Sequence, residues 1–232
     1  MIGLGTIING SAVIVGGIFG LIFKRFLNEK IESTITKACG VPTLFIGLYG
    51  ALSQMQQHGS QDMMTILSFC IGALIGEIID IEGKMEQFGE WLKKKSKNEG
   101  DTQFLDAFIT TSLTICIGAM AIVGAINDGL YGDYSILVAK SILDFIIVMV
   151  LTSSKGKGAI FSFIPVVLFQ GTFTLLAILI APIMTEAALA NISLIGAMLI
   201  FCIGINLIWD NFHIKVANML PAIVIAVLFA FF

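Results

Sequence analysis

A lysine and an aspartate lie four residues apart within one long apolar segment of the sequence. The segment reads DYSILVAKSILDFIIVMVLTSSKGKG and contains Lys140 and Asp144. Residues at this spacing share one face of a helix, so the two side chains can pair. Two interpretations stay open. The pair binds a proton or a charged solute within a membrane, or it is an internal salt bridge that neutralises both charges.

Amide and hydroxyl side chains within other apolar segments are weaker candidates. Such groups either contact a solute or join neighbouring helices by hydrogen bonds. Pro165 and Pro221 each remove a helical hydrogen bond and can expose a carbonyl to a cavity. We predict a polar pathway lined by Asn9, Gln54, Thr114, Asn127, Lys140, Asp144, Gln170 and Asn206. Acidic residues near segment ends are interpreted as solvated, namely Glu77, Asp80, Asp128 and Asp133.

The sequence lacks the residue patterns of catalytic and metal sites. Its four cysteines are far apart and form no C-x-x-C pair, which argues against a zinc or redox site. Its two histidines lie in different loops, and no H-E-x-x-H, G-x-S-x-G or P-loop pattern is present. Lysines are not interleaved with aromatic residues on one face. We therefore expect no enzyme activity, metal, cofactor or nucleic-acid partner.

Composition places these residues in a membrane. The 232-residue chain is 57% apolar and only 12% charged, and its mean hydropathy is +0.97. A soluble domain is about 25% charged, so the solvent of this chain must be lipid. The apolar segments are too long for strands and do not alternate. The sequence predicts an all-α, polytopic transmembrane helix bundle that forms a single domain over residues 1–232.

The apolar segments set the number of membrane crossings. A helix needs about 20 apolar residues to cross the hydrocarbon core. Eight segments meet or approach this length, and the second is the shortest, so seven crossings are the alternative. The segments cover about 4–23, 39–55, 62–80, 104–126, 134–153, 159–182, 188–208 and 214–232.

Basic residues predict the orientation of the chain. Twelve of the 13 lysine and arginine residues fall in every second loop, and the remaining one is Lys140. Loops rich in lysine and arginine stay in the cytoplasm. The pattern predicts a multi-pass protein of the bacterial cytoplasmic (inner) membrane with both termini outside, and it requires an even number of crossings.

Two of the cytoplasmic connectors have helical periodicity. The connector at about 24–37 places Leu27, Ile31 and Ile35 on one face, and the connector at about 82–101 places Met85 and Phe88 opposite its charges. Both are predicted to be amphipathic helices at the membrane surface. Binding of a partner protein is the alternative role.

Small residues recur at four-residue spacing in several segments. Glycine lets two helices approach closely, so these stripes are predicted to face other helices. The predicted packing positions are Gly16, Gly20, Gly47, Gly72, Gly76, Gly118 and Gly204.

A longer pattern overlies the glycines. The second and third, fourth and fifth, and seventh and eighth segments form pairs that begin with an F-I-G or C-I-G helix. The orientation prediction gives the last pair the opposite direction from the first two. Inverted repeats of this kind are common in transporters. Chance similarity between apolar segments explains the pattern equally well.

The opening GLGTIINGSAVIVGGIFGLIFKRF, the connector after it and TLFIGLYGA resemble the YqgA/YdfK-like family. These bacterial inner-membrane proteins share a domain of unknown function. The resemblance covers nearly the whole chain and includes Asn9, residues 42–47 and the LIGE end of the third segment. It implies an integral membrane or transport protein. It implies no substrate and no binding residue.

These features favour a transporter or channel for a small solute or ion. Its expected partners are the lipid bilayer, the solute or ion, and further copies of the chain in a homo-oligomer. The second class is a non-transporting membrane scaffold, or an assembly or sensory partner, in which the glycine stripes serve only helix packing. A water-accessible cavity along the fifth segment distinguishes the two classes.

Overall fold

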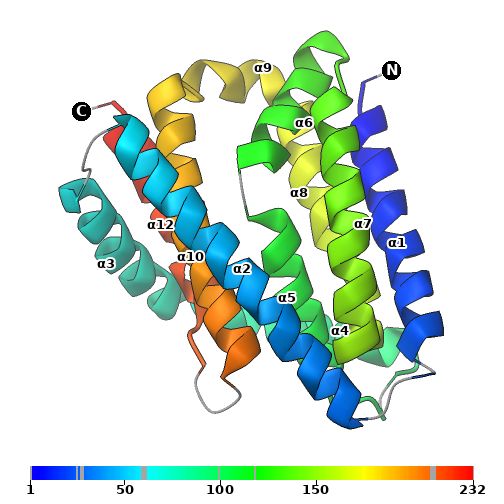
Figure 1. Cartoon of the computed structure of the whole chain (residues 1–232). Coiled ribbons are helices and arrows are strands. Elements are labelled where there is room, and N and C mark those ends of the chain that lie inside the picture. The colour runs from blue at the N-terminus through cyan, green and yellow to red at the C-terminus, as the bar shows by residue number, and fades with distance from the viewer. Residues whose placement is uncertain are drawn as a thin grey trace. The chain divides into compact units, whose positions relative to one another are not determined.

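The computed structural model describes residues 2–24, 26, 29–58, 62–98, 100–117, 119–209 and 213–231. These residues form helices and contain no strand, so the all-α prediction is confirmed (Figure 1). The elements are α1 (Leu4–Lys24), α2 (Glu29–His58), α3 (Asp62–Ile79), α4 (Ile81–Lys95), α5 (Phe104–Cys116), α6 (Ala119–Tyr131), α7 (Ser135–Lys155), η1 (Lys157–Ser162), α8 (Phe163–Leu175), α9 (Ala177–Ile180), η2 (Ala181–Ile183), α10 (Glu186–Ile208), α11 (Val216–Met219) and α12 (Pro221–Phe229).

Six helical segments among these residues are long and apolar enough to cross a membrane. They are α1, the part of α2 from Ser33 to Gln57, α3, α7, η1 with α8, and α10. A bent pair, α5 with residues 120–131, gives up to seven. The predicted eighth segment is the shorter apolar stretch Val216–Phe229. The prediction of eight crossings therefore exceeds the count by length and composition, because α11 and α12 are short.

The first predicted connector is not a separate helix. Residues 29–58 form the continuous helix α2, which carries the end of the connector directly into the second apolar segment. No glycine or proline interrupts residues 29–39, and the helix continues through Pro42. The second connector does form a helix of its own, α4. Asp80 separates α4 from α3 because its backbone is left-handed, with φ 54°.

The chain forms two compact units. Unit 1 contains residues 1–36, 85–116 and 120–180, and unit 2 contains residues 37–84, 117–119 and 181–232. Unit 1 is built from α1, α5, α6, α7 and α8. Unit 2 is built from most of α2 together with α3, α10, α11 and α12.

In unit 1, α1 and α7 run in the same direction at close range (Figure 1). Gly5 lies against Leu137 near the start of both helices, Gly16 against the backbone of Phe145, and Gly20 against the backbone of Met149. Helix α8 runs the opposite way along α1, because Gly10 lies against Val167 and Thr6 contacts Thr174. Absence of side chains at the α1 glycines permits this approach.

Helices α5 and α6 together extend along the whole of unit 1. Gly158 in η1 lies against the backbone of Phe104 at the start of α5. Gly129 near the end of α6 lies against the carbonyl of Thr174 at the far end of α8. The pair is bent by 62° between Cys116 and Met120. These contacts make α5–α6 one broken span rather than a loop that returns to its starting side.

Unit 2 uses the same close approaches. Gly47 of α2 lies against the backbone of Phe201, and Gly204 of α10 lies against the backbone of Leu44, so α2 and α10 are antiparallel. Gly72 and Gly76 of α3 lie in the same way against the backbones of Ala222 and Asn218, which belong to α12 and α11. Gly118, the remaining predicted packing position, lies outside the described residues.

Within each unit, the helix directions are those that alternating crossings require. In unit 1, α1 and α7 run one way, and α5 and α8 run the other. In unit 2, α10 runs opposite to both α2 and α12, since Asn191 of α10 donates to the carbonyl of Ala226 at the far end of α12. Which end of each unit faces the cytoplasm stays a prediction.

We predict that a methyl group at Gly16 destabilises the protein, whereas one at Gly171 does not. The new Cβ at Gly16 would lie 2.5 Å from the carbonyl oxygen of Phe145, but at Gly171 it meets no described atom within 4 Å. Gly16→Ala should lower the free energy of unfolding by about 1–3 kcal/mol, and Gly171→Ala should leave it unchanged or raise it by up to about 1 kcal/mol. Thermal unfolding of the two variants in detergent measures the difference. Equal stability would contradict the close approach of α1 and α7.

Candidate functional site

The predicted ion pair forms and is buried in unit 1. The Lys140 ammonium donates to both carboxylate oxygens of Asp144, with Nζ 2.7 Å from Oδ1 and 2.6 Å from Oδ2. Lys140 is 7% exposed and Asp144 is 2% exposed. A buried charge is tolerated only when it is paired and hydrogen-bonded. Both halves of the pair meet that condition.

The third proton of the ammonium is donated to the backbone of the broken span. Lys140 Nζ lies 2.7 Å from the carbonyl oxygen of Ile115, the next-to-last residue of α5. The last four carbonyls of a helix have no partner within that helix. The helix ends at Cys116, so the Ile115 carbonyl is one of these four, and Lys140 satisfies it.

Asn9 of α1 completes the contacts to the carboxylate. Its Nδ2 donates to Asp144 Oδ2 at 2.9 Å. Asn9 is fully buried, and its Oδ1 has no hydrogen-bond partner among the described residues. Asn9 therefore donates an N–H to the carboxylate, and its amide oxygen is an unused acceptor.

Gln170 of α8 supplies a second unused acceptor. The contacts of Thr6 with Thr174 and of Gly10 with Val167 fix the antiparallel register of α1 and α8. This register puts Gln170 at the level of Asn9. Gln170 is 1% exposed, and its Oε1 also lacks a partner among the described residues.

An apolar layer closes the site on one side. Val13, Ile115, Val148 and Val166 form one buried cluster drawn from α1, α5, α7 and α8. Val13 and Val148 lie one helical turn beyond Asn9 and Asp144, toward the ends of α1 and α7. Beyond this layer lie the buried hydroxyls of Thr111, Ser112 and Thr152. A second apolar cluster, built on Phe104 and Phe108, follows at the start of α5. On α7, Val148 lies between Asp144 and Thr152, so about two helical turns separate the site from these hydroxyls.

Another set of buried polar groups lies on the opposite side of the site, toward the start of α1. The hydroxyls of Thr6 and Thr174 lie 3.5 Å apart in the buried interior. Farther along, the fully buried Asp128 of α6 accepts from the backbone N–H groups of Gly3 and Gly5. The interpretation of Asp128 as a solvated end is therefore wrong. Its carboxylate caps the first turn of α1, where backbone N–H groups have no partner in the helix and attract negative charge.

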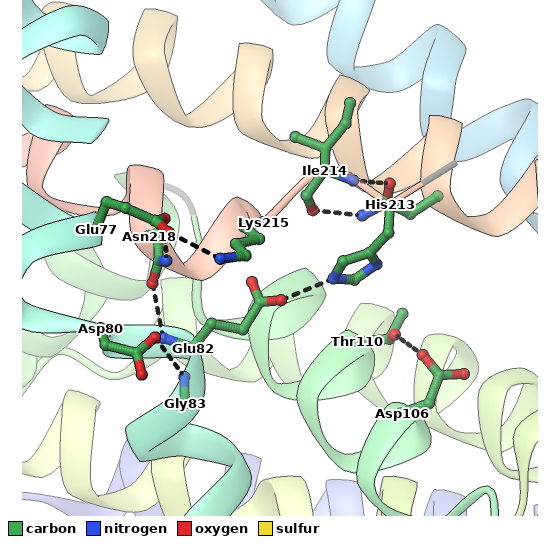
Figure 2. Close-up of polar contacts among 11 residues, drawn as sticks. Glu77, Asp80, Glu82, Gly83, Asp106, Thr110, His213, Ile214, Lys215 and Asn218 are labelled. Carbon is green, nitrogen blue, oxygen red and sulfur yellow. Dashed lines mark hydrogen bonds and ion pairs between the residues drawn. The ribbon is translucent and has the colours of Figure 1, made fainter. Parts of the chain in front are cut away.

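A second polar cluster lies in unit 2, where α3 and α4 meet the connection between α10 and α11 (Figure 2). Glu77 accepts from Lys215 at 2.8 Å and from the Asn218 amide at 2.7 Å. Asn218 Oδ1 accepts from the backbone N–H of Glu82 at 2.8 Å, which caps the start of α4. His213 Nε2 pairs with Glu82 Oε1 at 2.7 Å. One of these bonds satisfies the start of α4, and the others pair side chains of α3 and α4 with the connection and α11, so we interpret the cluster as a structural joint.

The family is decided by comparison with known proteins. Residues 4–231 match the family described as Protein of unknown function (DUF554). The chain belongs to this family. It is 31% identical over 230 residues to the uncharacterized protein YqgA of Escherichia coli (strain K12). This match covers 96% of this chain and 94% of that protein. It is 28% identical over 221 residues to the uncharacterized membrane protein YdfK of Bacillus subtilis (strain 168), with coverage of 95% and 93%.

These matches confirm the resemblance found in the sequence. The chain is a multi-pass membrane protein. One relative is named a membrane protein, and six described helical segments are long and apolar enough to cross a membrane. No solved structure matches it. The family description names no substrate.

Of the eight predicted pathway residues, Asn9, Lys140 and Asp144 are joined by hydrogen bonds at the broken span. Gln170 lies at their level on α8. Thr114 and Asn127 are half-buried in unit 1, and the Thr114 hydroxyl donates to the Thr110 carbonyl within its own helix. The two others belong to unit 2. Gln54 is half-buried on α2, and Asn206 exchanges two hydrogen bonds with the backbone of Ile214.

Several polar residues were not singled out from the sequence. Asn191 and Asn218 are buried and bind a backbone group of another helix or helix end. Asparagine within an apolar segment is the signal that could have found both. The role of the Ile115 carbonyl has no side-chain signal, because it depends on where α5 ends.

We predict that neutralising one member of the ion pair destabilises the protein more than neutralising both. Lys140→Met or Asp144→Asn leaves a buried charge without its partner, which should cost about 3–5 kcal/mol. The double variant removes both charges and should lose less than either single variant. Thermal unfolding of the four proteins in detergent gives the coupling energy. Single variants that lose under about 1 kcal/mol would match a solvated surface pair instead.

Proposed function

We propose that this protein is a membrane transporter or channel for a small solute or ion, and that it moves its solute chemically unchanged. The observation that carries the proposal is the Lys140–Asp144 pair bound to the carbonyl of a broken span. In many transporters, broken helices present backbone groups at mid-membrane, and the substrate site is formed there. Charged residues at this depth are costly and usually serve such a site.

The layered interior of unit 1 supports a pathway rather than an isolated pair. Polar side chains lie on both sides of the apolar cluster of Val13, Ile115, Val148 and Val166. The pair lies on the side of Thr6 and Thr174. In the predicted orientation that side faces outside, so the apolar layer separates the pair from the cytoplasm. We propose that this layer is the closed gate of the pathway.

We predict that flux through the purified protein in liposomes depends on the buried pair. The assay follows internal pH by dye while gradients of Na⁺, K⁺ or H⁺ are imposed. Lys140→Met/Asp144→Asn should lower the flux at least about tenfold, because each lost charge-assisted contact is worth about 1.5–3 kcal/mol. The control is Lys155→Met/Asp106→Asn, which removes an ion pair of the same residue types at the far ends of α7 and α5. This control should transport normally. Equal flux in all folded proteins would rule out a role for the pair.

A non-transporting membrane scaffold is the second candidate, and one observation favours it. All three protons of the Lys140 ammonium already have acceptors, and the pair is almost fully buried. A satisfied internal salt bridge needs no solute. In this alternative the pair and the glycine contacts serve only to hold the helices together.

We predict that access of water along α7 separates the two candidates. Single cysteines at Ser141 and Thr152, on either side of the apolar layer, are placed in a protein whose four native cysteines are replaced. A charged, membrane-impermeant thiol reagent added outside should label Ser141→Cys and not Thr152→Cys. Lipid-facing Ile142→Cys is the control, since Ile142 is 60% exposed on the helix surface. Labelling at neither buried position would favour the scaffold.

A further inference from the structure

We infer that Asp144 and the Ile115 carbonyl form a binding site for a small monovalent cation, which the Lys140 ammonium occupies in this structure. The inference rests on the proposed transport function and names its ion. Three oxygens surround the nitrogen, Asp144 Oδ1 at 2.7 Å, Oδ2 at 2.6 Å and the Ile115 oxygen at 2.7 Å. A bidentate carboxylate and a carbonyl freed at a helix end are also the ligands that desolvated cations take.

The charge of the site fits a single positive charge. Asp144 is the acidic residue in contact with Lys140, and it is buried. A divalent ion would leave an excess charge in the interior, where uncompensated charges are expensive. A monovalent ion replaces the ammonium with no change in net charge.

Two spare acceptors favour a free ion as the alternative occupant. Asn9 Oδ1 and Gln170 Oε1 are buried, and neither has a hydrogen-bond partner among the described residues. The Lys140 ammonium has three protons, and all three are in use. It therefore cannot serve these oxygens. A cation has no such limit, and a turn of the Asn9 amide would bring its Oδ1 toward Asp144.

The exchange requires the loss of one proton. When a cation binds to Asp144 and the Ile115 carbonyl, Lys140 changes from –NH₃⁺ to –NH₂. The proton is released to the aqueous phase from which the cation entered. Reversal of these steps on the other side of the membrane releases the cation and returns a proton to Lys140. The net process is the electroneutral exchange of one cation for one proton.

Other titratable groups near the pair are few. On α7 itself Asp144 faces Lys140, and on α5 the Cys116 thiol lies close enough to interact electrostatically with both. α1 and α8 contribute amides and hydroxyls. Asp128 and the Asp106–Lys155 pair lie toward opposite ends of the unit. Lys140 is therefore the group whose proton competes with the cation.

The first test measures binding without transport. Purified Lys140→Ala in detergent is heated in NaCl, KCl or choline chloride at equal ionic strength. NaCl or KCl should raise its Tm saturably by about 2–4 °C relative to choline, because a ligand that binds the folded state stabilises it. Lys140→Ala/Asp144→Asn lacks the carboxylate and should show no such difference. Lys155→Ala should respond like the wild type. An equal response of the first two variants would overturn the inference.

The second test uses the wild-type protein, in case Lys140→Ala does not fold. Binding of radioactive Na⁺ or K⁺ is measured at a series of pH values. Competition with one proton should lower the apparent Kd about tenfold for each unit of rising pH. A Kd that does not change with pH, or no binding at any pH, would overturn the inference. Binding without flux would overturn the transport proposal alone, whereas pair-dependent flux without binding would overturn the cation site alone.

Discussion

A protonated lysine inside a lipid-embedded helix bundle must be surrounded by acceptor oxygens, and this constraint organises unit 1. Asp144 on the same helix supplies two of the three acceptors. The third exists only because α5 ends at Cys116 and leaves the Ile115 carbonyl without a helical partner. The break and the lysine therefore compensate each other. Without the ammonium the carbonyl would be unsatisfied, and without the break the ammonium would lack an acceptor.

The glycine stripe of α1 belongs to the same arrangement. Asn9 reaches Asp144 because α1 lies against the backbone of α7, and the contact surfaces are Gly16 against Phe145 and Gly20 against Met149. A side chain at either glycine would move α1 outward and withdraw the Asn9 amide. The close approach and the polar site are thus coupled through one helix, and the stripe has a consequence beyond general packing.

Sequence reasoning succeeded where the signal is local to a helix and failed where it depends on where a helix begins or ends. The spacing of Lys140 and Asp144 is such a local signal, and so is the apolar length of most crossings. The continuity of α2 through residues 29–58 is not predicted from the sequence, because the polarity changes along the helix although the helix does not end there. Asp128 was missed for a related reason. Its partners are the backbone amides of Gly3 and Gly5, far away in the sequence, and amides carry no side-chain signal.

The apolar layer of Val13, Ile115, Val148 and Val166 divides the polar groups in the interior of unit 1 into two sets. On α7, Val148 lies one turn from Asp144 and one turn from Thr152, so the two polar groups are about 12 Å apart along the helix. The hydrocarbon core is about 30 Å thick. The layer thus takes up less than half of that thickness, and a second buried apolar cluster of Leu92, Phe104 and Phe108 lies at the start of α5. A bundle built only for packing has no need of this sequence of layers, because apolar side chains throughout would fill it without unpaired acceptors such as Asn9 Oδ1 and Gln170 Oε1. The two unpaired acceptors are explained if a cation passes through unit 1.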